Sequence, residues 1–197
     1  MRYFLDTEFI DRPDEAGIDL LTIALVSEDG RELYLGRRDE YASWSMRVRH
    51  ANDFVRQHVL PQLPLPENAF WVNRHELVRQ IDAFIGADPH PVFIGYYADY
   101  DWVAFCHLYG EMVQLPERFP KYCRDLKQWA DDLDHRFPPQ PKEGEHNALV
   151  DARWIRGAYW VLKGFHDDLR REIAQALRKG RVTVSEAAYE LLHVRVD

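Results

Sequence analysis

Two acidic residues interrupt an otherwise apolar segment close to the start of the chain. The alternation from Arg2 to Ile10 predicts a β-strand that carries Asp6 and Glu8. Side chains at positions i and i+2 share one face of a strand, so the two carboxylates project together. They repel each other and destabilise the strand unless cations neutralise them, and hard oxygen ligands suit Mg²⁺ or Mn²⁺. Taken alone, however, an Asp-x-Glu pattern is more often a solvent-facing strand end.

The first third of the chain has the pattern of a β-meander. Strands are predicted over Arg2–Ile10, Asp19–Ser27 and Arg31–Arg38, with residues 28–30 as the hairpin turn between the last two. A further buried strand is predicted over Pro91–Tyr97.

Apolar residues spaced three and four apart predict helices in the rest of the chain, with Asn52 and Asn73 as N-caps of the first two. These helices span Asn52–Leu60, Asn73–Ile85, Asp99–Tyr109, Tyr122–His135 and Ala148–Leu162. An extended loop is predicted over residues 137–141, and further helix from Phe165 onward with a break at Gly180. Strands followed by helices and another strand indicate an α/β fold, a mixed sheet flanked by helices in a single domain over residues 1–197 with a C-terminal helical part from about residue 165.

Composition limits the class of protein. A chain of 197 residues with 46% hydrophobic content can bury the core of one domain. No segment approaches the roughly 20 apolar residues of a membrane span, and charges near the start replace the apolar part of a signal peptide. We therefore expect a cytoplasmic protein without a membrane partner, in which Cys106 and Cys123 stay reduced and unpaired.

The net charge of −8 is unusual for a protein that binds nucleic acid, because phosphate binding normally requires a basic surface. If four carboxylates bind two divalent cations, the remaining groups sum to −8 + 4 = −4 and the occupied site is near neutral. A modestly acidic protein can therefore still accept a phosphodiester at such a site.

A second acidic motif, Tyr-Ala-Asp-Tyr-Asp over residues 97–101, follows the predicted strand at 91–97. Its acidic residues lie at a strand-to-helix junction, where α/β proteins commonly place functional groups. Asp99 stands where an N-cap would serve the next helix, whereas Asp101 is followed by the apolar run Trp-Val-Ala-Phe. Either residue is a candidate.

A third motif places His146 five residues before Asp151. Asp151 lies at the start of a predicted apolar helix, so the histidine is expected on the preceding loop. Each residue alone has an ordinary explanation, because an aspartate at a helix start is often a capping charge and a lone histidine is usually structural. Their combination with the acidic pair at the chain start is harder to explain in that way.

The three motifs together resemble the DEDDh branch of the DnaQ-like 3′ to 5′ exonucleases, which have a ribonuclease H-like fold and include ribonuclease T and oligoribonuclease. The spacing of His146 and Asp151, with alanine next, is similar to this branch and not to the branch with tyrosine in this place. The match of Asp101 to the family pattern favours it over Asp99. Many members have asparagine where Tyr97 stands.

The resemblance implies a two-metal phosphodiester hydrolysis. Asp6, Glu8, Asp101 and Asp151 would hold two divalent cations, Mg²⁺ or Mn²⁺, and His146 would take a proton from the attacking water. The expected product is a nucleoside 5′-monophosphate.

The expected substrate is RNA with a single-stranded 3′ end, and single-stranded DNA is the alternative within the same chemistry. Thr7, Phe9, Ile10 and Tyr97 are predicted to contact the terminal nucleotide, and a homodimer is compatible with the resemblance. Two other classes of function stay open. One is a catalytically silent ribonuclease H-like module that binds nucleic acid, which would be expected to lack a carboxylate, and the other is a phosphatase or nucleotide hydrolase acting on small molecules.

Overall fold

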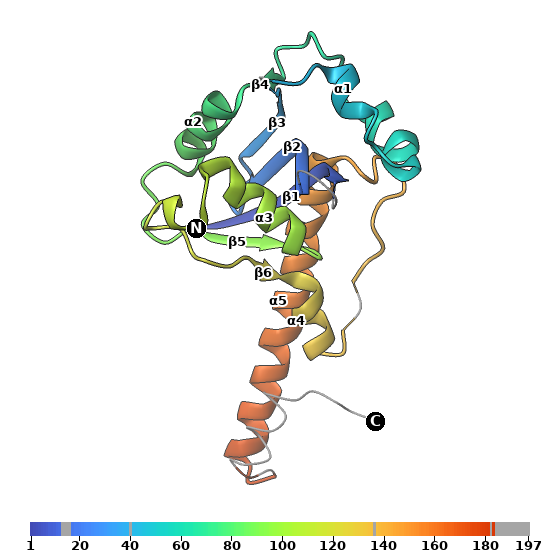
Figure 1. Ribbon diagram of the computed structural model, residues 1–197. Coiled ribbons are helices and arrows are strands. Elements are labelled where there is room, and N and C mark those ends of the chain that lie inside the picture. Colours follow the sequence, from blue (N-terminus) through green and yellow to red (C-terminus); the bar gives the residue numbers. More distant parts are fainter. Residues whose placement is uncertain (13–16, 40, 136, 182, 184–197) are drawn as a thin grey trace.

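A six-stranded mixed β-sheet forms the centre of the protein (Figure 1). The computed structural model describes residues 1–12, 17–39, 41–135, 137–181 and 183. The strands are β1 (Arg2–Arg12), β2 (Gly17–Ser27), β3 (Glu32–Arg37), β4 (Trp71–Val72), β5 (Val92–Gly95) and β6 (Arg124–Asp125). Their order is β4-β3-β2-β1-β5-β6. Strands β1 to β3 form an antiparallel meander, as predicted, whereas β4, β5 and β6 each join a neighbour in parallel.

Helices cover both faces of this sheet. They are α1 (Trp44–Val48), α2 (Arg74–Ile85), α3 (Asp99–Tyr109), α4 (Leu126–Asp132) and α5 (Ala148–Arg178). On β1, Leu5 belongs to the core cluster that contains α2 and α3, whereas Phe4 belongs to the cluster that contains α4 and α5. Because alternate side chains of a strand point to opposite faces, α3 and α5 lie on opposite sides of β1.

Three short helical segments complete the structure: η1 (Val55–Val59), η2 (Leu60–Gln62) and η3 (Met112–Gln114). The first is a π-helix, and it packs Val55 and Val59 against Ile10 in a third core cluster. This cluster covers the end of β1 that lies beyond Glu8.

The architecture confirms the predicted α/β class, a mixed sheet flanked by helices in one compact domain, and it is consistent with a ribonuclease H-like fold. Helix α3 has the predicted bounds. Helix α2 begins after its predicted cap, because the Asn73 side chain accepts a hydrogen bond of 2.8 Å from the Glu76 amide. No described helix is long and apolar enough to cross a membrane.

Several local predictions differ from the structure. The helix predicted over 122–135 is a short strand followed by α4, because Asp125 Oδ1 accepts from the Gln128 amide at 2.9 Å and starts the helix there. Helix α5 continues through Gly164 to Arg178, where two helices were expected, and ends before Gly180 at φ 61°. Much of the C-terminal part predicted from Phe165 onward lies outside the described residues, which end at 181 and 183.

Candidate metal centre

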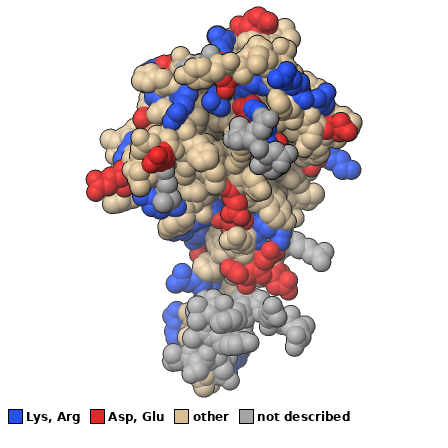
Figure 2. All heavy atoms as spheres, viewed as in Figure 1, with Lys and Arg blue, Asp and Glu red and all other residues tan. Residues whose placement is uncertain are grey.

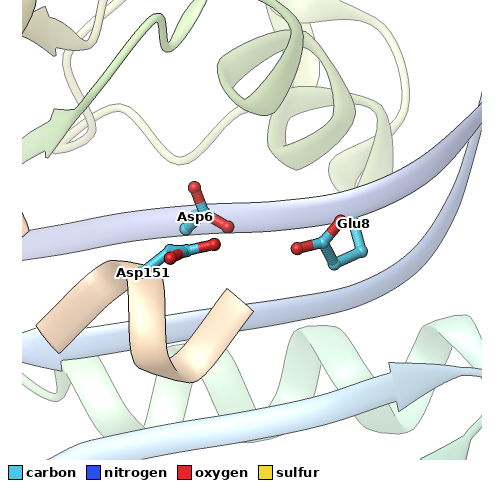
Figure 3. A group of neighbouring side chains, drawn as sticks. All are labelled: Asp6, Glu8 and Asp151. Atoms are coloured by element: carbon cyan, nitrogen blue, oxygen red, sulfur yellow. The ribbon is translucent and has the colours of Figure 1, made fainter. Parts of the chain in front are cut away.

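Three carboxylates from two distant parts of the chain meet on one face of the sheet (Figure 3). Asp6 and Glu8 come from β1 and Asp151 from the first turns of α5, and one oxygen of each lies within 4.8 Å of the others. The i, i+2 spacing places the first two on one face of the strand, as predicted, and the helix that packs on this face supplies the third.

Small side chains let α5 approach the sheet closely. Ala148 and Ala152 are fully buried and belong to the same core cluster as Ala24 of β2, which pairs with Asp6. Methyl groups on both surfaces shorten the distance between the helix and the sheet, so Asp151 reaches the carboxylates of β1.

Burial and mutual repulsion dominate the electrostatics of this cluster. Burial, followed by the charges of Asp101, Glu8 and Asp151, raises the pKa of Asp6 well above its usual range. Burial and then the charges of Asp151 and Asp101 raise the pKa of Glu8 to about 8. Burial also raises the pKa values of Asp101 and Asp151 to about 6. No cationic side chain of the described residues contributes to these shifts.

One oxygen atom of Asp151 has no partner among the described residues. Its Oδ2 accepts a hydrogen bond of 3.0 Å from the His146 amide, whereas its Oδ1 is buried without any hydrogen bond. An unpaired buried carboxylate oxygen is costly. Together with Asp6 and Glu8, Asp151 supplies the hard oxygen ligands that Mg²⁺ and Mn²⁺ prefer. The residues present therefore fit a divalent cation.

Asp101 lies on the other side of β1, next to the three carboxylates. Its Oδ1 accepts hydrogen bonds from the Thr7 amide, at 3.0 Å, and from the Thr7 hydroxyl. Strand β5 pairs with β1 only as far as Phe4, so the edge of β1 at Thr7 is open to a side chain. Asp101 is 7% exposed and Asp99 is exposed, so of the two candidates only Asp101 lies beside the cluster.

His146 lies on the loop before α5, as expected, in the left-handed backbone region at φ 68°. Its amide is held by Asp151, and its ring packs against Phe54, with a distance of 4.8 Å between the ring centroids. The helix itself is capped by Asn147, whose side-chain oxygen accepts from the amides of residues 149 and 150. Asp151 is therefore not the N-cap of α5.

No family model matches the chain. The chain is similar to two proteins of Mycobacterium tuberculosis, the 3′-5′ exoribonuclease MT2234.1 of strain CDC 1551 / Oshkosh and the 3′-5′ exoribonuclease Rv2179c of strain ATCC 25618 / H37Rv. Each is 40% identical over 157 residues, which cover 78% of this chain and 88% of the relative. The chain belongs to this 3′-5′ exoribonuclease family.

The four residues predicted to contact the terminal nucleotide differ in how exposed they are. Phe9 stacks on Tyr100, with ring centroids 5.8 Å apart and an interplanar angle of 12°, and Tyr97 is 65% exposed. Thr7 is buried and hydrogen-bonded to Asp101. Ile10 is only 1% exposed and packs in the core against η1, so the prediction of an Ile10 contact is not supported.

One residue that sequence reasoning missed is Tyr34 of β3. Burial raises its pKa to about 12, and the charges of Glu8 and Asp6 add to that shift. Its hydroxyl accepts a hydrogen bond of 3.3 Å from the Asn147 side chain. Tyr34 pairs with Ala24, and Ala24 pairs with Asp6, so Tyr34 lies level with Asp6 across the sheet. The sequence alone does not reveal this, because it does not give the register of the strands.

Proposed function

We propose that this chain is a metal-dependent 3′ to 5′ exoribonuclease of the DEDDh, DnaQ-like type, which releases nucleoside 5′-monophosphates from a single-stranded 3′ end. The observation that carries the proposal is the cluster of Asp6, Glu8 and Asp151. One carboxylate oxygen of each lies within 4.8 Å of the others, and no lysine or arginine of the described residues pairs with them. The names of the two relatives support RNA as the substrate and the 3′ end as the starting point. We treat residues 1–197 as one exonuclease domain.

In this proposal, four carboxylates would hold two Mg²⁺ or Mn²⁺ ions. Asp6, Glu8 and Asp151 would hold one, and Asp6 with Asp101, directly or through water, the other. When bound, such cations supply a water molecule of lowered pKa and stabilise negative charge on the phosphate. The chain's own part is to keep these oxygens converged before substrate arrives, which the packing of α5 on β1 achieves.

His146 would accept the proton of the attacking water. Its backbone amide contacts Asp151, so the loop places this histidine next to a carboxylate of the cluster, and imidazole is the commonest general base in enzymes. The hydrogen bond between its amide and Asp151 links the position of the base to that of the ligand. This hydrogen bond would thus couple the residue that transfers the proton to one that holds a cation.

Two exposed aromatic rings, Tyr100 and Tyr97, are available to an unpaired 3′ base. The stacked pair of Phe9 and Tyr100 adjoins Glu8 on β1, and Tyr97 lies at the junction that leads to Asp101. Stacking of a base on an aromatic ring contributes about 1 to 3 kcal/mol and favours single strands. On the face drawn in Figure 2, acidic and basic side chains are interspersed. We expect the bound cations to provide the main contact with the phosphate. Single-stranded DNA remains the alternative substrate.

The deciding experiment is digestion of 5′-labelled RNA and DNA of the same sequence, with Mg²⁺, with Mn²⁺ and with EDTA. We expect a ladder of shortened RNA that starts from the 3′ end and that EDTA abolishes. Immediate release of the labelled 5′ nucleotide would contradict the polarity, and hydrolysis of p-nitrophenyl phosphate in place of RNA would favour a phosphatase.

A matched pair of variants tests the middle ligand. Asp101→Asn should remove activity, because it withdraws a charge from the cluster, whereas Asp99→Asn should keep it, because Asp99 is exposed. The reverse result would reassign the ligand.

The proposed base is tested by His146→Ala. Loss of a general base costs roughly 10² to 10⁴-fold in kcat, and the pH dependence of kcat should change shape. Wild-type kcat with a loss of cation affinity in calorimetry would instead make His146 a ligand.

A further inference from the structure

The segment around the π-helix η1 is in contact with the ring of His146. The Phe54 ring lies edge-on to it, with an interplanar angle of 75°, and the His58 ring lies 5.9 Å from it. Phe54 and His58 are themselves in contact at 5.1 Å. The imidazole therefore has two aromatic neighbours from a part of the chain about 90 residues away, which none of the three acidic motifs includes.

A single side chain connects this segment to the backbone of the histidine loop. The Gln62 amide nitrogen donates to the His58 carbonyl at 2.7 Å and to the Glu145 carbonyl at 2.6 Å. One donor group thus bridges the end of η1 and the residue that precedes His146. The ring contacts and this bridge are independent observations on the same loop.

The other side of the segment is anchored in the core. Val55 and Val59 are 6% and 1% exposed and pack against Ile10, which lies two residues beyond Glu8 on β1. The Asn52 side chain accepts a hydrogen bond of 2.9 Å from the Val55 amide and fixes the start of the segment. A π-helix is rare and frequently occurs at a functional site. Residues 52–62 therefore form a fixed support between the acidic strand and the histidine loop.

We propose that Phe54 and Gln62 are positioning residues for His146, which hold its ring and its loop in the place needed for proton transfer. The inference rests on the role proposed above for His146. A residue other than glycine keeps a left-handed backbone only where its surroundings hold it, and His146 has φ 68°. Phe54 restrains the ring, Gln62 restrains the preceding carbonyl, and Asp151 restrains the amide.

Phe54 is 51% exposed, so a direct contact with a substrate base is the competing explanation. The two roles differ in what they change. Loss of a positioning residue lowers kcat and has an effect only while His146 is present, whereas loss of a base-stacking residue raises KM whether or not the histidine is present.

The test is a double-mutant cycle on RNA hydrolysis, by steady-state and single-turnover kinetics. Phe54→Ala and Gln62→Met should each lower kcat by roughly 10 to 100-fold with KM unchanged, because a small misplacement of a catalytic group has this effect. Phe54→Tyr, which keeps the ring, should stay near wild type. In the His146→Ala background, Phe54→Ala should cause no further loss.

Tyr41→Ala serves as the control, since Tyr41 is 94% exposed. Thermal unfolding and Mn²⁺ titration of each variant check that the fold and the acidic cluster are intact. An increase in KM at unchanged kcat, or an equal loss of rate with and without His146, overturns the inference and leaves the proposed function standing. Wild-type turnover in His146→Ala itself would instead remove the proposed base, and the positioning role with it.

Discussion

The protein has buried carboxylates in two regions. In one region they are paired with arginine, and in the other no described side chain neutralises them. On β2, Asp19 is 7% exposed. Its carboxylate accepts hydrogen bonds from Nη2 and Nε of Arg47, at 2.8 and 3.1 Å. Arg37 lies 3.6 Å from the same carboxylate. Arg47 is itself buried, so this region is a complete ion pair within the fold.

The cluster of Asp6, Glu8 and Asp151 has no such partner among the described residues, although Glu8 and Asp151 are buried to a similar extent. Its pKa values are raised, and one of its oxygen atoms lacks any hydrogen bond. The comparison teaches that the Asp19 carboxylate receives its counter-charge from the chain, whereas the acidic cluster receives none from the described residues, as a cation site requires.

The largest effect we expect is a loss of RNA hydrolysis when a carboxylate of the acidic cluster is replaced. Asp6→Asn and Asp151→Asn should each reduce RNA hydrolysis by about 10³-fold or more, because cation binding contributes several kcal/mol to such reactions. Removing a charge from a crowded acidic cluster should not reduce the stability of the metal-free protein. Retention of more than about a tenth of the wild-type rate at saturating Mn²⁺ would count against the ligand assignment.

Substitutions in the region of Asp19 and Arg47 should instead change the stability of the fold. Arg47→Ala leaves Asp19 buried without its main partner and should lower the free energy of unfolding by about 3 to 5 kcal/mol, measured in urea. The control is Arg153→Ala, which breaks the more exposed pair with Glu32 and should cost at most about 1 kcal/mol. Similar losses in the two variants would show that Arg47 does not neutralise a buried charge.

The pH dependence of stability should come from the unpaired region. A pKa that is higher in the folded protein than in the unfolded chain gives stability that is complete below pH 4 and is lost as the pH rises through the folded value. The metal-free protein should therefore lose stability between about pH 5 and the folded value of about 8 for Glu8. Glu8→Gln should flatten that slope in urea unfolding, and equal slopes in the two proteins would contradict the assignment.

The smallest expected effect is stabilisation by the cation. Mn²⁺ at a hundred times its Kd should raise the free energy of unfolding by about 2.7 kcal/mol, and EDTA should reverse this. Asp6→Asn should abolish the gain, whereas Arg153→Ala should keep it. A gain of the same size in Asp6→Asn would indicate a cation bound elsewhere.

Much of the scaffold followed from local patterns. The period of two in β1 put Asp6 and Glu8 on one face, and the Asn73 cap fixed the start of α2. The loop before α5 could also be predicted from the sequence, because an apolar helix begins directly after Asn147. These features depend on residues within a few positions of one another, so the sequence contains all that determines them.

Contacts between distant segments were decided only by the tertiary structure. The acidic pair and Asp151 are more than 140 residues apart, and only the packing of small residues between α5 and the sheet brings them within 4.8 Å. The burial of Ile10 and the contact between Phe54 and His146 depend in the same way on where η1 packs. A sequence by itself determines which side chains share a face of a strand or helix, because that spacing is local. Which faces meet depends on how the whole core packs, and that is a property of the folded chain.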